Sequence, residues 1–249
     1  MVEFSRNGSV GIIQLERPPA NAIDEVTLRS LMEIRDLISS DTSVRAVVVQ
    51  GSSRIFCGGV DIKMVRDFLA RDGGKATMLA FVERLQQFFR DWRRLPIPTI
   101  AALAGSATGG GLELALSCDL RVASAEAMFG LPEVKLGLIP GAGGTQLLSH
   151  IAGPATATRL ILTGALVSGS EAEDLGIVHT ALPQQQVNEK AQEWAQLIAA
   201  QSPLAVRAAK ECLLIAPSPD GYTTEIDATG RLLEHGDGSE RVAAFLSRP

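Results

Sequence analysis

Short apolar runs separated by helical segments limit this chain to a sheet that is covered on both faces. Val44–Gln50 is β-branched and almost wholly apolar, Thr99–Ala104 is a second buried run, and Leu120–Ser124 is predicted as a further strand. Apolar residues recur at helical spacing over residues 24–39, and again over residues 63–95 with a break at the glycines near 73. Buried strands that alternate with helices predict an α/β core with right-handed crossovers.

The two ends of the chain depart from this alternation. Near the N-terminus, Asn7-Gly8 lies between two short strand-like runs, which predicts a β-hairpin with a type I′ turn. After Pro183 the chain contains four helical patterns and no strand between them, over residues 186–200, 203–215, 223–235 and 239–246. We therefore expect a core over residues 1–185 and a C-terminal helical region over residues 186–249.

Composition narrows the function classes. The 249 residues carry a net charge of −5 and have a pI near 5.3, which is not typical of a nucleic-acid-binding protein. Cys57, Cys118 and Cys212 are widely spaced and suggest neither disulfides nor a metal site, so we expect a reducing, cytoplasmic location and no metal. Residues 1–6 lack a signal or transit pattern, and the uncharged stretch 136–158 is interrupted by glycines and prolines. We expect no targeting segment and no membrane span.

Several common catalytic motifs are absent from the sequence. The chain has no phosphate-binding Gly-x-x-x-x-Gly-Lys-Ser/Thr loop, no Gly-x-Ser-x-Gly elbow and no His-Glu-x-x-His. Gly141-Ala-Gly-Gly144 resembles the start of a dinucleotide-binding loop but lacks the third glycine and the acidic residue at the required distance. These absences argue against a P-loop enzyme, a serine hydrolase, a zinc protease and a Rossmann dehydrogenase.

Two glutamates lie where a charge is difficult to explain as structure. Glu113 follows the glycines at 109–111 and has apolar neighbours, and Glu133 follows Pro132 at a turn. Burial of a carboxylate in apolar surroundings is costly unless the group is paired, protonated or used. The structural alternatives are a buried ion pair with Arg121 for Glu113 and a solvated turn for Glu133. Together the two residues suggest a general acid/base pair that acts on a bound substrate.

Two glycine-containing loops can supply backbone donors beside these acids. Gly109-Gly-Gly111 and Phe56-Cys-Gly-Gly-Val-Asp-Ile-Lys63 each follow a predicted buried strand. Glycine turns expose backbone N–H groups, and two such loops at the ends of neighbouring strands can direct two donors at one oxygen. The alternatives are close helix–strand packing for the first loop and, for the second, a surface loop in which Asp61 caps the next helix. Cys57 is a weak nucleophile candidate because no histidine lies near it in the sequence.

Three long motifs resemble the crotonase (enoyl-CoA hydratase/isomerase) superfamily. They are residues 56–63, residues 109–119 and Phe129-Gly-Leu-Pro-Glu-Val-Lys-Leu-Gly-Leu-Ile-Pro-Gly-Ala-Gly-Gly-Thr-Gln146. The resemblance extends from the N-terminal hairpin to the C-terminal helices. It implies an α/β, crotonase-like spiral of ββα units with a CoA-thioester site in residues 1–185, followed by a helical trimerisation region in residues 186–249. It further implies a homotrimer or dimer of trimers, an acyl-CoA thioester substrate and no separate cofactor, since CoA is part of the substrate.

The resemblance also implies roles for individual residues. The oxyanion-hole amides of the family fall on Val60, where alanine is usual, and on Gly110. Hydratases of the family carry two acids, which correspond here to Glu113 and Glu133, whereas many isomerases keep only one. The segments that border CoA in the family place the following residues at that ligand: Ala20, Ala22, Ile23, Val60, Asp61, Ile62 and Lys63.

The reaction that follows from this resemblance is syn addition of water to a 2-enoyl-CoA, giving a 3-hydroxyacyl-CoA, as in fatty acid β-oxidation. Glu113 is expected to orient and activate the water, and Glu133 to deliver a proton to the α carbon. The alternatives are another crotonase reaction, such as Δ3-Δ2 isomerisation, hydration of a branched substrate or decarboxylation, and a non-catalytic acyl-CoA-binding protein.

Overall fold

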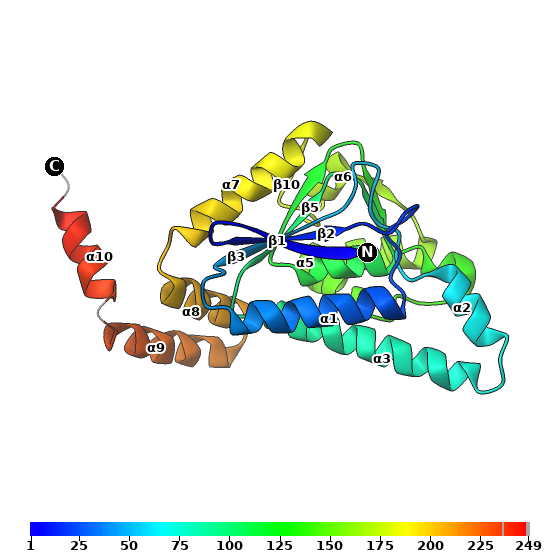
Figure 1. Ribbon diagram of the computed structural model, residues 1–249, viewed down its shortest axis with the longest axis horizontal. Helices are drawn as coiled ribbons and strands as arrows, with labels where there is room; N and C mark the ends of the chain where they lie inside the picture. The colour runs from blue at the N-terminus through cyan, green and yellow to red at the C-terminus, as the bar shows by residue number, and fades with distance from the viewer. Residues whose placement is uncertain (236, 248–249) are drawn as a thin grey trace.

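A computed structural model describes residues 1–235 and 237–247, and its strands form two sheets (Figure 1). The larger sheet has six strands in the order β1-β2-β3-β5-β7-β10. Its neighbouring strands run parallel except for β1 and β2, which form an antiparallel hairpin. The strands of this sheet are β1 Val2–Asn7, β2 Val10–Leu15, β3 Ala46–Gln50, β5 Thr99–Leu103, β7 Leu120–Ser124 and β10 Thr180–Leu182.

The smaller sheet has four short strands in the order β4-β6-β8-β9. They are β4 Ile55–Cys57, β6 Ser106–Thr108, β8 Met128–Gly130 and β9 Val167–Ser168. The sequence predicts only a loop over residues 51–60, whereas the structure places β4 there. Two or three residues are too few to show the alternation of apolar and polar side chains by which a strand is recognised, so the pattern could not reveal this sheet.

The strands and helices repeat as ββα units, as the resemblance implies. β3 and β4 lead into α2, β5 and β6 into α4, and β7 and β8 into α5, so each unit places one strand in each sheet. Two 3₁₀ helices, η1 Glu133–Leu136 and η2 Gln184–Gln186, lie between these elements. The α-helices are α1 Glu25–Ser40, α2 Ile62–Leu69, α3 Gly74–Arg93, α4 Gly110–Ser117, α5 Gly144–Thr163, α6 Gly169–Asp174, α7 Val187–Ala199, α8 Pro203–Leu214, α9 Pro219–Leu233 and α10 Asp237–Leu246.

Both faces of the larger sheet are covered, which confirms the prediction from the apolar runs. On one face Val47 and Val49 of β3 join the main core, which includes buried side chains of α1, α3 and α4. On the other face Ala46 and Val48 pack with four buried residues of α7, which are Val187, Ala191, Ala195 and Ala199. Figure 1 shows α7 on one side of the sheet and α1 and α3 on the other. The small side chains of α7 bring its axis close to the strands.

The N-terminal hairpin forms, but its turn is not of type I′. Asn7 pairs with Val10, so the two loop residues are Gly8 and Ser9. Gly8 has φ 61, whereas neither Asn7 nor Ser9 has a positive φ. A type I′ turn needs positive φ at both central residues, so the prediction of that turn type was wrong. The glycine, rather than the asparagine, takes the left-handed position because it has no Cβ.

The four helical patterns after Pro183 correspond to α7, α8, α9 and α10. α7 packs on the sheet, whereas α9 and α10 extend away from it (Figure 1). The expected boundary at 185/186 stays a prediction, and positions 236, 248 and 249 of the C-terminal region lie outside the described residues. Within residues 1–235 and 237–247, no helix combines the length and the apolar character that a bilayer crossing requires.

A buried charged pair ties α8 to the ends of the central strands. Lys210 Nζ lies 2.6 Å from Asp119 Oδ2 and donates to the Ile97 carbonyl at 3.1 Å. The same carboxylate oxygen accepts hydrogen bonds from the N–H and the hydroxyl of Thr99, at 2.7 and 3.0 Å. Only 7% of the Lys210 side chain is exposed. Removal of one partner from such a pair leaves a charge in a poorly solvated place.

We therefore expect Lys210→Met to lower the free energy of unfolding by about 3 kcal/mol, because Asp119 loses its cation while the apolar stem is retained. Denaturant titration of purified protein measures this change. Lys190→Met is the matched control, since it breaks an ion pair with Glu193 whose side chains are 34% and 51% exposed, and it should lower stability by less than about 1 kcal/mol. Equal effects of the two substitutions would contradict the importance of the buried pair.

Candidate active site

Glu113 lies in the first turn of α4 with only 2% of its surface exposed. Its Oε1 atom accepts hydrogen bonds from the N–H groups of Ala142, at 2.9 Å, and Gly144, at 2.8 Å. Ala142 lies in the turn before α5, and Gly144 is the first residue of that helix. The predicted alternative, an ion pair with Arg121, is wrong, because the Arg121 guanidinium donates to the backbone carbonyls of Ile177 and Cys118, each at 2.7 Å.

The burial of Glu113 changes its protonation. Desolvation raises the pKa of this carboxyl from 4.5 to about 7, and the nearby charge of Glu133 adds to the rise. The hydrogen bonds from Gly144 and Ala142 act in the opposite direction because they favour the ionised form. Burial and the neighbouring charge of Glu133 therefore favour the protonated form of Glu113.

Glu133 begins η1 directly after Pro132 and is half-buried. Its Oε2 atom is buried and has no hydrogen-bond partner among the described residues. Burial raises the pKa of this carboxyl above 4.5. The alternative prediction of a solvated turn residue is therefore wrong. A buried carboxylate oxygen without a protein partner is rare and suits an atom that exchanges a proton with a ligand.

The glycines at 109–111 serve packing and the site together. A Cβ on Gly111 would lie 2.0 Å from the Cys57 carbonyl oxygen, so this glycine lets α4 pack directly on β4. A Cβ on Gly109 would lie 3.0 Å from Glu133 Oε1, and Gly109 has φ 54 and ψ −132. Gly111 therefore fits the packing alternative, whereas Gly109 lies beside a candidate acid, as the site hypothesis expects.

The backbone N–H groups of Val60 and Gly110 belong to two segments that approach closely near the carboxylates. Gly110 is the first residue of α4, so its N–H has no partner within the helix. A Cβ built on Gly110 would lie 3.4 Å from the Val60 nitrogen, which measures how closely the two segments approach. The isolated bridge between Ile23 and Val60 uses the N–H groups of Ile23 and Asp61, and not that of Val60. Their use as two donors to one oxygen atom stays a prediction.

The loop predicted to border a ligand lies against the same segment. The Ala20 carbonyl accepts the Gly58 N–H at 2.8 Å, and Ile23 bonds to Gly59 and Asp61 through its backbone. The Ile23 side chain is buried in the core, whereas the side chains of Ile62 and Lys63 are exposed. Contact with a ligand stays a prediction for the whole set of residues, which are Ala20, Ala22, Ile23, Val60, Asp61, Ile62 and Lys63.

Asp61 acts as a helix cap, as one of the two predicted alternatives states. Its Oδ1 accepts the Lys63 N–H at 2.9 Å at the start of α2, and its Oδ2 lies 2.6 Å from Arg17 Nη2. Burial acts to raise the pKa of this carboxyl, but the hydrogen bonds from Arg17 and from the backbone of Lys63 and Met64 hold it below 3.8. Cys57 is fully buried, and burial raises the pKa of its thiol to about 12, so a thiolate nucleophile is disfavoured.

Sequence reasoning missed three participants in this site. Ala142 and Gly144 hold Glu113 through their backbone, and Arg17 holds Asp61. The glycines at 141, 143 and 144 were the only signal for the first two, since they free backbone N–H groups at a helix start. No local pattern links Arg17 with Asp61, which lies 44 residues further along the chain.

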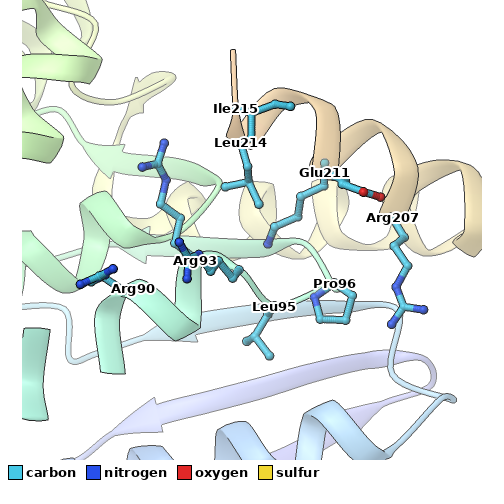
Figure 2. Close-up of a pocket in the computed structure, with 10 residues that line it drawn as sticks. Arg90, Arg93, Leu95, Pro96, Arg207, Glu211, Leu214 and Ile215 are labelled. Atoms are coloured by element: carbon cyan, nitrogen blue, oxygen red, sulfur yellow. The ribbon is translucent and has the colours of Figure 1, made fainter. Parts of the chain in front are cut away.

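A cavity of about 540 Å³ lies elsewhere, between the C-terminal end of α3 and α8. Figure 2 shows its arginine side chains together with Leu95, Pro96 and Leu214. The cavity is lined mainly by cations and apolar residues, which are Arg90, Arg93, Arg94, Leu95, Pro96, Arg207, Lys210, Glu211, Leu214 and Ile215. Neither of the two candidate acids lines it, so it is a feature distinct from the acid pair.

Comparison with known proteins gives one consistent family. A sequence model described as enoyl-CoA hydratase/isomerase matches residues 5–243. A Bacillus subtilis protein named "Probable enoyl-CoA hydratase" is 37% identical over 243 residues, which cover 96% of this chain and 93% of that protein. The human "Enoyl-CoA hydratase domain-containing protein 2, mitochondrial" is 42% identical over 229 residues, covering 89% of this chain and 74% of the human protein.

Solved structures agree with the sequence comparison. The crystal structure of an enoyl-CoA hydratase from Bacillus anthracis superposes with a TM-score of 0.92 at 34% identity, covering 98% of this chain and 95% of that chain. A structure of an enoyl-CoA hydratase from Polaromonas has a TM-score of 0.93 at 28% identity, covering 98% and 96%. The fold implied by the sequence motifs is thereby confirmed.

The burial of Glu113 predicts a pH-dependent loss of stability. Its pKa in the folded protein, about 7, lies above the ordinary 4.5. The stability that Glu113 contributes by holding a proton is therefore complete when the pH is below 4.5, and it is lost as the pH rises through about 7. The difference corresponds to about 3 kcal/mol. Because glutamine cannot ionise, Glu113→Gln should flatten the dependence of the free energy of unfolding on pH, as measured by denaturant titration at several pH values from about 5 to about 8.

The exposed residue Glu126 provides the control for this experiment. Glu126→Gln should retain the wild-type pH dependence because it changes a solvated carboxylate. Parallel stability curves for the wild type and Glu113→Gln would contradict the raised pKa.

Proposed function

The chain belongs to the enoyl-CoA hydratase/isomerase family, and we propose that within this family it is a hydratase that adds water to a 2-enoyl-CoA to give a 3-hydroxyacyl-CoA. The observation that carries the proposal is the pair of acids, buried Glu113 and half-buried Glu133, beside the closely spaced backbone segments of Val60 and Gly110. Glu113 is fixed by two N–H donors. Glu133 has its Oε1 beside Gly109, and its buried Oε2 has no hydrogen-bond partner among the described residues. Hydration needs one group that accepts a proton from water and another that gives a proton to carbon.

The chemistry follows from the places of these groups. The thioester oxygen binds at the N–H groups of Val60 and Gly110, which stabilise the negative charge that develops on it. As the water oxygen bonds to the β carbon, Glu113 takes a proton from the water and the π electrons move toward the thioester oxygen. Glu133 then protonates the α carbon and the carbonyl reforms. The pair begins with one proton and ends with one, and exchange between the two carboxyls, directly or through water, restores the starting state.

The hydrogen-bond pattern supports this division of roles. Glu113 Oε1 already accepts two N–H bonds, so a proton on Glu113 can be held only by Oε2. The fixed carboxylate suits a base that must orient water before it reacts. Glu133 Oε2 has no hydrogen-bond partner in the part of the chain that the structure describes, so it is free to present a proton to a carbon atom. CoA is part of the substrate, and the proposed reaction needs no separate cofactor.

A second reaction of the family is supported by the raised pKa of Glu133, because a single acid at this position suits proton transfer between carbon atoms in a Δ3-Δ2 isomerisation. Mass spectrometry separates the two reactions, since hydration alone adds one water to the substrate. A protein that binds acyl-CoA in calorimetry but changes no substrate would favour the non-catalytic alternative. A cytoplasmic location likewise stays a prediction.

The central prediction concerns the acid pair. With crotonyl-CoA, the wild type should remove the absorbance of the conjugated enoyl thioester, and Glu133→Gln should lower kcat by about 10² to 10⁴-fold because the proton donor is lost. Glu113→Gln should have an effect in the same range, and Glu126→Gln should retain full activity. An inactive wild type on enoyl-CoAs of several chain lengths would overturn the hydratase assignment.

We also propose that the chain assembles as a homotrimer or a dimer of trimers. α9 carries an exposed apolar stripe at helical spacing, formed by Tyr222, Ile226 and Leu233, which are 78%, 74% and 80% exposed. The arginine-lined cavity of Figure 2 supports the proposal, because none of its four arginines forms an ion pair within residues 1–235 and 237–247. Those four are Arg90, Arg93, Arg94 and Arg207. Acidic side chains of a second copy can supply the missing partners.

Light scattering tests this assembly. Ile226→Lys should lower the measured mass from that of a trimer or hexamer toward that of one chain, because a charge would be placed in an apolar contact. Val26→Lys is the control, since Val26 is also exposed, at 64%, but lies on α1. A wild type with the mass of a single chain would contradict the proposal.

A further inference from the structure

Arg17 joins two segments that meet behind the candidate oxyanion site. It lies in the loop after β2, and its Nη2 atom is 2.6 Å from Asp61 Oδ2 and 2.9 Å from Asp24 Oδ2. Its Nη1 atom donates to the Ala22 carbonyl at 3.3 Å. The loop is shaped by Asn21, which has φ 50 and whose side chain accepts the Arg17 N–H at 2.8 Å. One guanidinium therefore contacts both the 17–24 loop and the start of α2.

Both carboxylates that Arg17 binds are also helix caps. Asp24 Oδ1 accepts the Thr27 N–H at 2.8 Å at the start of α1, and Asp61 Oδ1 accepts the Lys63 N–H at 2.9 Å at the start of α2. Each carboxylate thus uses one oxygen for its helix and the other for Arg17. Negative charge at a helix N-terminus is favourable, but two carboxylates on one nitrogen repel each other once the cation is removed.

The backbone between these anchors sets the direction of the Val60 N–H. Ile23 donates to the Gly59 carbonyl at 2.7 Å, and Asp61 donates to the Ile23 carbonyl at 2.9 Å. In this parallel bridge, the N–H of the residue between the two bonded positions lies on the opposite edge, which here faces Gly110. Val60 directly precedes Asp61, so a displacement of the Asp61 anchor rotates the Val60 peptide.

The partial burial of these groups strengthens the ion pairs of Arg17 with Asp24 and Asp61. Arg17, Asp24 and Asp61 side chains are 34%, 21% and 16% exposed. A charged pair in such a place is screened less by solvent than a surface pair. A planar guanidinium can bridge two carboxylates and a carbonyl at once, which the point charge of a lysine reproduces only in part.

We infer that Arg17 is a positioning residue of the oxyanion site, which holds the Ile23–Val60 contact in register so that the Val60 N–H stays directed at the thioester oxygen. This inference rests on the proposed function. Arg17 touches no reacting atom and acts through Asp61, Asp24 and the bridge. The competing explanation is that Arg17 only joins the starts of α1 and α2 and so contributes to stability alone.

The test uses the full chain with Arg17→Met, Arg17→Lys and the double variant Arg17→Met/Asp24→Asn. The double variant removes the carboxylate repulsion while asparagine keeps the helix cap. Arg6→Met is the control, because it breaks the Arg6–Asp41 pair at the other end of α1, where the side chains are 39% and 32% exposed. The readouts are kcat and KM for hydration, the melting temperature, and the absorbance shift of a bound conjugated enoyl-CoA. That shift reports polarisation of the thioester carbonyl.

We expect Arg17→Met to lower kcat by about tenfold to a hundredfold, somewhat less than the loss of a whole oxyanion donor. KM should change little, and the absorbance shift should shrink. Arg17→Lys should retain part of kcat and of the shift, and the double variant should recover part of what Arg17→Met loses. Arg6→Met should match the wild type in kcat and in the shift.

If Arg17→Met lowers the melting temperature but keeps the wild-type kcat and absorbance shift, the inference is overturned, and Arg17 contributes to stability alone. If Arg17→Met does not fold, a full wild-type kcat and shift in Arg17→Lys would overturn it equally. A wild type that binds the enoyl-CoA without an absorbance shift would instead refute the oxyanion site, and with it the proposed function. The two failures are therefore distinguishable.

Discussion

The contact of α4 with the end of β4 determines where Glu113 and Gly110 lie. Gly111 leaves so little space that a Cβ would lie 2.0 Å from the Cys57 carbonyl oxygen. Because α4 approaches this closely, Gly110 lies beside Val60, and Glu113 is carried into the interior on the first turn of the same helix. A side chain at position 111 would push the helix outward and would separate the two amides. Glu113 and the approach of Gly110 to Val60 thus depend on one backbone contact.

The interior placement of Glu113 is maintained against its own preference for solvent. The N–H groups of Ala142 and Gly144 satisfy one carboxylate oxygen, which links α4 to the turn before α5. Desolvation nevertheless raises the pKa to about 7, so the folded chain keeps a proton available at neutral pH. Burial of the Glu113 carboxyl therefore costs stability, while the two apolar faces of the larger sheet stabilise the fold.

Sequence patterns predicted the elements that have enough residues to show a period. The buried strands and the helices from α1 to α4 follow from local patterns. The smaller sheet did not, since its strands are two or three residues long and pair only through the tertiary fold. In the site, the motifs predicted Glu113, Glu133, Val60 and Gly110, whereas Arg17 pairs with residues that only the folded chain brings to it. A motif shows only residues that are close together in the sequence, so it cannot reveal an ion pair between residues that are far apart along the chain.

In the proposed reaction, backbone amides and side chains have different roles, which separates the reaction type from the substrate range. The amides of Val60 and Gly110 polarise the thioester in this proposal, and the two acids act within a few atoms of its carbonyl. The proposal therefore leaves the acyl chain to segments further along the chain, which expose apolar side chains. Leu136 and Ile139 follow Glu133 and are 60% and 71% exposed, and Ile62 and Leu69 of α2 are 55% and 61% exposed. Such side chains can change size without disturbing the hydrogen bonds that fix the acids, so the acyl preference can vary while the chemistry stays the same.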